Sequence, residues 1–372
     1  MRLLPAIAAG CLLQLIGLFH AHAQTPSAAP LRIAIVGATH AHIGFILGRK
    51  NKEDVQVVGI YEPNTDLARR LAKNYHLDTA ILYTDLTKML NAVKPEAAVA
   101  FGSIYEHMAA VEACAPRGIH VMVEKPLAVS VEHVRRMQAL AARYKIHLLT
   151  DYETSWYPSN AKAYALVNDS SWIGGIRKVV IHDGHQGPKE IHVNPEFFEW
   201  LTDPKANGGG ALIDFGCYGA NLMTWLMRGR QPLSVSAVTQ HFKPAIYPKV
   251  DDDATIVVSY PAAVCIIQAS WNWPFSRKDM EVYGETGYVI AVDNTNMRLR
   301  NASTKGEKTL QVTAQDVPVY TDPFSYFKDV IRGKISEESS GLYSLENNVT
   351  VVRILDAARE SARTGKAVRF VK

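Results

Sequence analysis

Three side chains that can move protons lie in two short blocks of the sequence. Lys125 belongs to the run GIHVMVEKPLAVS, in which Glu124, Lys125 and Pro126 end a predicted strand. Asp214 and Tyr218 lie four residues apart in NGGGALIDFGCYGANL, and this spacing places both side chains on one face of a predicted helix. An ammonium group lowers the pKa of a nearby phenol, so the three residues together predict a site for general acid–base catalysis. The alternative for Tyr218 is a core aromatic on an amphipathic helix.

A second candidate site is the turn after the first predicted strand. The stretch RIAIVGATHAHIGFI has the letters GATHAH at 37–42, where a dinucleotide-binding unit has G-x-G-x-x-G. Gly37 is present, but Thr39 and His42 replace the second and third glycines, with His40 between them. The Thr39 hydroxyl can donate to a phosphate, as can the amides at the start of the following helix. We therefore interpret the turn as an unusual dinucleotide site.

Two further acidic residues bear on this turn. Glu62 comes twenty residues after His42, at the end of the next predicted strand, where an acidic side chain accepts hydrogen bonds from the adenosine ribose and favours NAD over NADP. The alternative for Glu62 is a solvated turn residue. His40 and His42 could instead coordinate a metal ion with Glu124. Two histidines on a loop are not a metal signature, and no metal site is predicted.

The elements that must position these groups alternate in the first part of the chain. From residue 31 to residue 150, apolar strand patterns alternate with amphipathic helical patterns, which predicts an α/β domain with a doubly wound parallel sheet of the Rossmann type. Ligands bind beyond the carboxyl ends of such strands, which places Lys125 beside a nicotinamide. The predicted strands are 31–36, 55–61, 81–83, 97–101, 120–123 and 146–149, and clear helical patterns cover 67–75 and 131–144.

The second part of the chain has longer strand-like runs separated by turn signals. They extend from 179 to about 319, and a predicted helix at 211–227 follows three consecutive glycines. This pattern predicts an α+β domain over 151–343 with a large, mostly antiparallel open sheet. A C-terminal segment, 344–372, begins with a helical pattern that stops at Gly365.

Together these motifs resemble those of the Gfo/Idh/MocA oxidoreductases over nearly the whole chain after the N-terminal segment. The matching runs are YEPN, YEHMAAVEACAPRGIHVMVEKPL, GGGALIDFGCYGANL, WNWP, VYGETGYV and TGKAVRF. The resemblance implies NAD(P)-linked hydride transfer on sugars or related polyols, with NAD preferred, and an oligomer formed through the open sheet. It places His107, Glu124 and Lys125 at the cofactor. Lys125 and Tyr218 would handle the hydroxyl proton while Asp214 orients the sugar. Many members have a histidine at position 218; the branch with glucose–fructose oxidoreductase and dihydrodiol dehydrogenase has a tyrosine.

Substrate residues are predicted in three runs of the second part, TSWYPSN, HDGHQGPKE and WNWP. Trp156, Tyr157, His185 and Trp271 offer aromatic faces and hydrogen-bonding groups, which suit a carbohydrate. The alternative for each aromatic side chain is a place in the core.

The N-terminus predicts export. An apolar run from Leu3 to Phe19 precedes Ala21-His22-Ala23, which fits a small-x-small cleavage site. Residues 1–23 are therefore a predicted signal peptide and 24–30 a linker. The mature chain would begin at Gln24, in the periplasm or secreted, without a membrane span. A membrane anchor is the alternative, although the run is short for one.

The charge and cysteine content of the chain indicate which kinds of partner and crosslink are not expected. The formal charge of +4 comes without a basic run interleaved with aromatic residues, so no nucleic-acid partner is predicted. After cleavage three cysteines remain without CxxC spacing, which indicates no disulfide framework. An exported dehydrogenase would lack a cytoplasmic partner to recycle its cofactor, and tight binding of NAD with internal regeneration would remove this problem. The net reaction is then oxidation or, alternatively, glycoside cleavage; a carbohydrate-binding protein that has lost its cofactor is the third interpretation.

Overall fold

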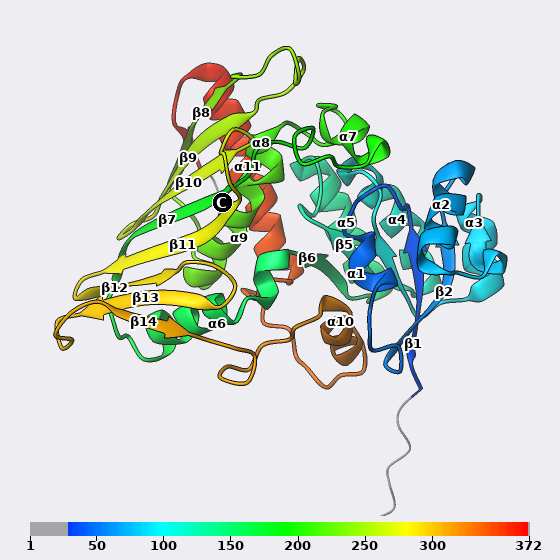
Figure 1. Ribbon diagram of the computed structural model, residues 1–372, viewed down its shortest axis with the longest axis horizontal. Helices are drawn as coiled ribbons and strands as arrows, with labels where there is room; N and C mark the ends of the chain where they lie inside the picture. Colours follow the sequence, from blue (N-terminus) through cyan, green and yellow to red (C-terminus); the bar gives the residue numbers. More distant parts are fainter. Residues whose placement is uncertain (1–28, 371–372) are drawn as a thin grey trace, which may run out of the picture.

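The computed structural model describes residues 29–370, and its N-terminal domain is built on a parallel sheet of six strands (Figure 1). The strand order is β3-β2-β1-β4-β5-β6, which is that of a Rossmann fold and confirms the predicted fold class. The strands are β1 Leu31–Val36, β2 Val55–Tyr61, β3 Leu82–Tyr83, β4 Ala97–Ala100, β5 His120–Glu124 and β6 Leu148–Asp151. The helices between them are α1 Ile43–Leu47, α2 Thr65–Tyr75, α3 Leu86–Val93, α4 His107–Cys114 and α5 Val131–Tyr144.

The second domain is a nine-stranded sheet with the order β14-β13-β12-β11-β7-β10-β9-β8-β15. Only β7 and β10 pair in parallel, and every other neighbouring pair in this described sheet is antiparallel. The predicted mostly antiparallel sheet is thus confirmed. Its strands are β7 Ile176–Gly184, β8 Ser234–Gln240, β9 Asp253–Ser259, β10 Val264–Ser270, β11 Arg277–Gly284, β12 Gly287–Ala291, β13 Asn296–Asn301, β14 Lys308–Gln311 and β15 Val368–Arg369. The helices of this part are α6 Pro158–Tyr164, α7 Pro195–Leu201, α8 Ala211–Asp214, α9 Gly216–Leu226, α10 Pro323–Ile331 and α11 Leu345–Thr364.

The helix predicted at 211–227 is two helices, because α8 ends at Asp214 and Phe215 separates it from α9. The glycines before and within this region allow close packing. A Cβ on Gly210 would lie 1.7 Å from the carbonyl oxygen of Asp251, and one on Gly219 would lie 2.5 Å from the Ile267 side chain. The Asp251 carboxylate also accepts hydrogen bonds from the amides of Gly210 and Leu212. Asp214 is therefore placed by backbone contacts that only glycine permits.

Helix α11 joins the two domains. Its N-cap is Ser344, whose hydroxyl accepts from the Asn347 amide at 3.1 Å, and Gly365 ends it in the left-handed conformation with φ +67°. The helix contacts α9 and β8 of the second domain and α5 of the Rossmann domain. The strand that follows it, β15, pairs with β8, so this segment completes the second sheet.

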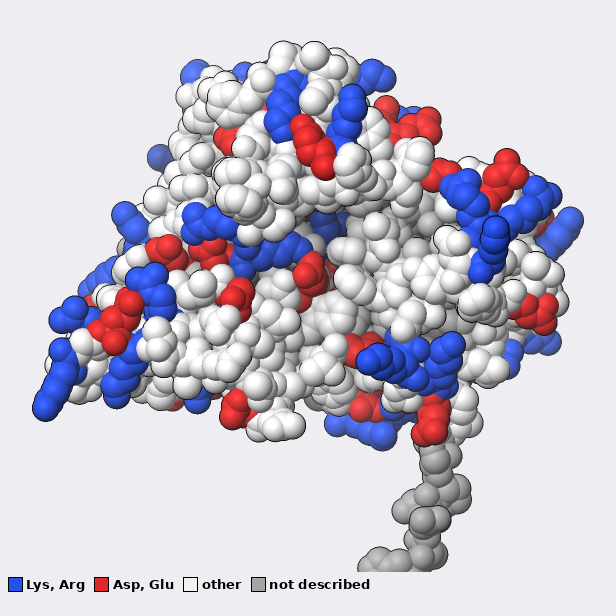
Figure 2. All heavy atoms as spheres, in the orientation of Figure 1, with Lys and Arg blue, Asp and Glu red and all other residues white. Residues whose placement is uncertain are grey.

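Several sequence predictions concern segments or surfaces outside the two sheets. The signal peptide, the start at Gln24 and most of the linker lie outside the described residues. None of the helices that the structure describes is long and apolar enough to cross a bilayer. Cys114, Cys217 and Cys265 are buried free thiols. Acidic and basic side chains are interspersed on the face seen in Figure 2.

Candidate active site

A buried ion pair connects the two domains at the carboxyl end of β5. The Lys125 Nζ donates to Asp214 Oδ1 at 2.5 Å and to the Asp214 carbonyl oxygen at 3.0 Å. Burial alone would lower the pKa of Lys125, but the charge of Asp214 and the hydrogen bond to it outweigh burial and raise the pKa. Burial alone would likewise raise the pKa of Asp214, and the Lys125 ammonium reverses this shift. Both groups are therefore charged at neutral pH.

The partner of the second Asp214 oxygen corrects one prediction. The Trp271 indole donates to Asp214 Oδ2 at 3.0 Å, and the Trp271 side chain is fully buried. Trp271 therefore belongs to the core and does not offer a face to a carbohydrate. Because Lys125 donates to one carboxylate oxygen and Trp271 to the other, Asp214 orients Lys125; its predicted contact with the sugar stays a prediction.

Tyr218 lies beside this pair, as predicted, but its pKa is not lowered. The Nζ atoms of Lys125 and Lys278 lie 5.0 Å and 4.8 Å from the centre of the Tyr218 ring. Burial nevertheless raises the pKa of Tyr218, and the nearby carboxylate of Glu153 adds to this effect. The phenol therefore keeps its proton at neutral pH. The Tyr218 side chain is 1% exposed, as in the alternative of a core aromatic, and its oxygen makes no hydrogen bond within the described part of the chain, so its hydrogen-bonding capacity is unused.

Sequence reasoning missed two charged side chains on the strands that face Tyr218. Asp183 of β7 and Lys278 of β11 are direct cross-strand neighbours and therefore share one sheet face. The Asp183 side chain is 1% exposed and its Oδ1 atom has no hydrogen-bond partner among the described residues. Burial raises its pKa well above the usual range, although Lys278 opposes this shift. Burial thus favours the protonated form of the Asp183 carboxyl group. Only the strand register shows that Asp183 and Lys278 are neighbours, and the sequence alone does not give this register.

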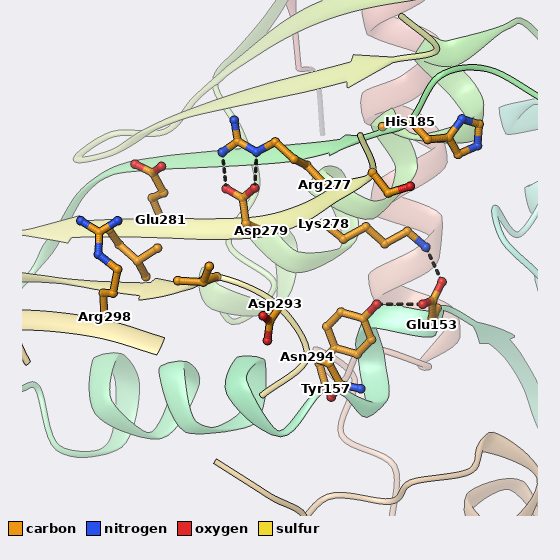
Figure 3. A pocket seen from close by; sticks show the side chains of 14 residues that line it. Glu153, Tyr157, His185, Arg277, Lys278, Asp279, Glu281, Asp293, Asn294 and Arg298 are labelled. Atoms are coloured by element: carbon orange, nitrogen blue, oxygen red, sulfur yellow. Dashed lines mark hydrogen bonds and ion pairs between the residues drawn. The ribbon is translucent and has the colours of Figure 1, made fainter. Parts of the chain in front are cut away.

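A polar cavity of about 560 Å³ opens next to these residues (Figure 3). Lys278 forms an ion pair with Glu153, which also accepts from the Tyr157 hydroxyl at 2.8 Å. Tyr157 and His185 both line this cavity, where they were predicted to meet the substrate. Trp156 does not line it; its ring packs edge-on against Phe45, 5.3 Å between centroids. The remaining lining residues include Arg277, Asp279, Asp293 and Asn294.

The first residue of the turn after β1, Gly37, has the conformation of the first glycine in a dinucleotide-binding loop. Gly37 has φ +71°, and a Cβ there would lie 2.8 Å from the Cα of Gly102, at the end of β4. The Glu62 carboxylate is already used by the backbone, because it accepts from the amides of Ala38 and Asn64, both at 2.8 Å. In this arrangement Glu62 shapes the loop, and its predicted hydrogen bonds to a ribose stay a prediction.

The two loop histidines gather around Glu124. His42 Nδ1 lies 3.0 Å from Glu124 Oε1, and His40 Nε2 lies 4.0 Å from Glu124 Oε2. The His42 amide donates to His40 Nδ1 at 3.1 Å, so the neutral His40 ring carries its proton on Nε2, the nitrogen that faces Glu124. Burial lowers the pKa of His40 and keeps it neutral. A metal would need that nitrogen unprotonated. The His42–Glu124 hydrogen bond anchors the loop to β5, and the ligand atoms of His40, His42 and Glu124 also lie within 4.8 Å of one another, as a metal site requires.

Helix α7, from the second domain, covers this loop. The Trp200 indole donates to Thr39 Oγ1 at 2.9 Å, and the Asn194 amide donates to the Thr39 carbonyl oxygen at 3.3 Å. The Phe197 ring lies 4.4 Å from the His40 ring. The Thr39 hydroxyl, predicted to face a phosphate, is thus bonded to protein. The run NPEFFEW has the Asn N-cap and N-terminal proline of a short helix, but nothing in it indicates that it lies over the loop.

A cleft of about 760 Å³ separates α7 from the carboxyl edge of the Rossmann sheet. Its walls include Thr39, Asn64, Ser103 and Tyr105, which follow β1, β2 and β4, the place where this fold binds dinucleotides. The amides of Thr39 and Ala41 donate to no acceptor within the described residues and are available to a diphosphate. The residues present therefore fit NAD, with fewer free loop amides than a three-glycine turn offers.

His107, predicted at the cofactor, lies deeper. It is fully buried, its Nδ1 is 3.3 Å from the Leu127 carbonyl oxygen, and burial lowers its pKa to about 4. His107 therefore supports the turn after Glu124, Lys125 and Pro126 and lines neither cavity.

Two models of protein families match this chain. Residues 31–152 match the model of an oxidoreductase family described as an NAD-binding Rossmann fold, and residues 161–290 match the GFO/IDH/MocA C-terminal domain. The chain belongs to the Gfo/Idh/MocA oxidoreductase family. Its N-terminal domain is the NAD-binding domain of this family, which confirms both the predicted family and the predicted cofactor.

The chain is also similar to curated enzymes and to solved structures. It is 25% identical to the trans-1,2-dihydrobenzene-1,2-diol dehydrogenase of Xenopus laevis over 82% of the chain and 90% of that enzyme. With the Xenopus tropicalis enzyme it shares 29% identity, but over only about half of each chain (50% and 52%). An aldose–aldose oxidoreductase from Caulobacter crescentus, complexed with glycerol, has the same fold, with a TM-score of 0.77, 20% identity and coverage of 92% and 100%. An inositol dehydrogenase homologue from Azotobacter vinelandii, complexed with NAD+, aligns with a TM-score of 0.78, 18% identity and coverage of 92% and 98%.

The tautomer of His40 predicts that the purified protein holds no stoichiometric metal at this cluster. Elemental mass spectrometry of the native chain should find only substoichiometric zinc, manganese or iron. Extended treatment with a chelator should leave the melting temperature and NAD binding unchanged. An ion present at one equivalent that is lost with the chelator, and lost again in Glu124→Gln, would overturn this reading of the cluster.

Proposed function

We propose that this protein is an exported NAD-dependent oxidoreductase that transfers hydride at a carbinol carbon of a sugar or related polyol. The observation that carries the proposal is the Lys125–Asp214 pair beside the unbonded Tyr218 hydroxyl, at the carboxyl edge of a Rossmann sheet. Bound in the α7 cleft, NAD would accept a hydride from this carbon or return one to it.

The chain's own groups handle the oxygen of the substrate. An ammonium has three N–H donors, and Lys125 directs its Nζ toward two oxygens of Asp214, so one donor remains for the substrate oxygen. Lys125 then stabilises the negative charge that develops on this oxygen. Because Lys125 and Tyr218 both keep their protons at neutral pH, either can donate to a carbonyl oxygen during reduction. Oxidation uses the same path in reverse.

The polar cavity supports a polyhydroxylated substrate. Glu153, Tyr157, His185 and Asn294 line it, and together they offer donors and acceptors to several hydroxyl groups. The dihydrodiols and aldoses after which the similar enzymes are named also carry carbinol carbons.

The acid–base assignment predicts a large loss of turnover, which in Tyr218→Phe comes without loss of fold. Removing one positioned acid–base group costs about 10²–10⁴-fold in rate, and Lys125→Ala and Tyr218→Phe should each show a loss of this size on one active substrate. Tyr288→Phe is the matched control, since its hydroxyl contacts Glu307 on the surface, and it should keep full activity. NAD binding by fluorescence titration should persist in Tyr218→Phe. Full activity of Tyr218→Phe together with full activity of Lys125→Ala would rule out this site.

The export part of the proposal rests on the sequence of the first 23 residues. An apolar run followed by Ala21-His22-Ala23 is removed by signal peptidase in secreted proteins. Intact-mass measurement of the periplasmic and extracellular fractions should find a chain that begins at Gln24. Full-length chain confined to the cytoplasm or the membrane would contradict export and leave the reaction proposal untouched.

We also propose that the chain self-associates through the sheet face opposite α9. Val180, Ile266 and Val257 are direct neighbours across β7, β10 and β9, and each is partly exposed in the single chain. Val238 of β8 is 61% exposed. Light scattering should give at least twice the chain mass, and Ile266→Lys should reduce it to one chain. A native protein that is monomeric at all concentrations would refute this interface.

A further inference from the structure

The polar cavity of about 560 Å³ extends well beyond the residues that lie next to Tyr218 (Figure 3). Along β11 it is lined by Arg277, Lys278, Asp279 and Glu281, a rise of about 13 Å at ~3.3 Å per residue. Successive side chains of a strand point to opposite faces of the sheet. Lys278 therefore lies on one face, and the other three residues lie on the opposite face.

The strand register shows which face this second group of lining residues shares. Glu281 is the direct neighbour of Val180 of β7, on the face opposite α9. Ile290 of β12 is the direct neighbour of Glu281 and of Arg298 of β13, so these side chains lie on the same face. The cavity thus has an inner part beside Tyr218, formed by Glu153, Tyr157 and Lys278. Its outer part is formed by Arg277, Asp279, Glu281, Ile290 and Arg298.

An opening between β11 and β12 connects the two parts. β12 pairs with β11 only from Met280 onward, so residues 277–279 have a described strand neighbour on the β7 side alone. The loop 292–294 lines the other side of the opening. Ser159 of α6 holds this loop, because its amide donates to the Asn294 carbonyl oxygen at 3.1 Å and its hydroxyl donates to the preceding carbonyl oxygen. The cavity is therefore continuous from the proposed reaction site to the far face of the sheet.

The outer part has no excess charge. Arg277 donates to both carboxylate oxygens of Asp279, at 2.7 Å and 2.9 Å. Arg298 donates in the same way to Glu307, at 2.8 Å and 2.9 Å. With Glu281, the outer part contains two basic and two acidic side chains. This balance does not favour an ionic ligand.

Several hydrogen-bonding groups of the cavity are nevertheless unused. Arg277 and Arg298 bind their carboxylates through Nε and Nη2, and neither Nη1 atom has an acceptor within residues 29–370. The Asn294 side-chain amide and the Ser276 hydroxyl also line the cavity and make no hydrogen bond to described residues. Ile290 adds an apolar surface. Donors, acceptors and an apolar surface together fit a neutral sugar ring, which has hydroxyl groups and C–H faces.

We propose that the substrate carries a second sugar ring, so that this protein acts on a neutral disaccharide or longer saccharide and not on a free monosaccharide. The inference rests on the proposed function. The reacting ring lies in the inner part beside Tyr218, and the second ring lies in the outer part, where Arg277 and Arg298 donate to its hydroxyl groups. The cavity volume is within the ~300–1,000 Å³ of pockets for drug-sized ligands, which are larger than one hexose.

The test compares matched sugars by calorimetric titration of the full soluble chain, with and without NADH, which cannot oxidise the sugar. The probes are glucose, galactose, mannose and N-acetylglucosamine, each beside α- and β-linked disaccharides with the same residue at the non-reducing end. At least one disaccharide should bind about tenfold or more tightly than its monosaccharide, because its second ring gains hydrogen bonds to charged donors.

Two arginines of β13 provide matched variants. Arg298→Ala removes a donor of the outer part and should weaken disaccharide binding about tenfold, with the monosaccharide affinity unchanged. Arg300→Ala removes another exposed arginine from the same strand face, two residues further on and outside the cavity wall, and should leave both affinities unchanged. Tyr157→Phe changes the inner part and should weaken both ligands alike.

The outcomes separate this inference from the other proposals. Light scattering should give the same mass for Arg298→Ala as for the native chain, because the sheet interface proposed on this face is centred on β10 and β9. Disaccharides that never bind more tightly than their monosaccharides, or equal losses in Arg298→Ala and Arg300→Ala, would overturn the second ring. An inactive protein that keeps the disaccharide preference would contradict the proposed reaction alone, since the titrations measure binding and not turnover.

Discussion

The buried contact between Lys125 and Asp214 is the constraint on which the rest of this site depends. Lys125 follows the last residue of β5 in the Rossmann domain, and Asp214 ends α8 in the second domain, so the pair fixes one domain against the other at the reaction site. Two charges lose their hydration when they are buried, and the arrangement is tolerable only if every remaining polar atom is paired. Trp271 meets that requirement for the second carboxylate oxygen, and removing one member of such a pair is destabilising by about 3–5 kcal/mol.

The same requirement explains the glycines before Asp214. Helix α8 can start where it does because Gly210 lies against the Asp251 backbone and the Asp251 carboxylate accepts two amides. A side chain at Gly210 would push the helix away and separate Asp214 from Lys125. The conspicuous triplet in the sequence is thus a packing device that positions an ion pair, and it does not bind phosphate.

The sequence patterns predicted the local elements of the fold but not the contacts between distant residues. The alternation of strands and helices predicted β1 to β6 well, because strands buried on both faces leave continuous apolar runs. The start of the last helical pattern at 344 and its stop at Gly365 were also predicted, since helix ends are set by local sequence. The hydrogen-bond partners of Thr39, Glu62 and Trp271 could not be predicted, because each partner lies on another part of the fold. Asp183 and Lys278 were missed for the same reason, as only sheet register makes them neighbours.

The contrast between two buried aspartates is a further consequence of the ion pair. Asp214 has the Lys125 ammonium as its partner and stays charged, whereas Asp183, with no partner for Oδ1, is kept neutral by burial. Environments that push two similar groups to opposite protonation states mark the acid and base roles of a site. Here the charged aspartate fixes the Lys125 ammonium, and burial favours the protonated form of the other. Helix α7 covers the adjoining nucleotide cleft from the second domain, so substrate and cofactor would meet between surfaces that the ion pair holds together.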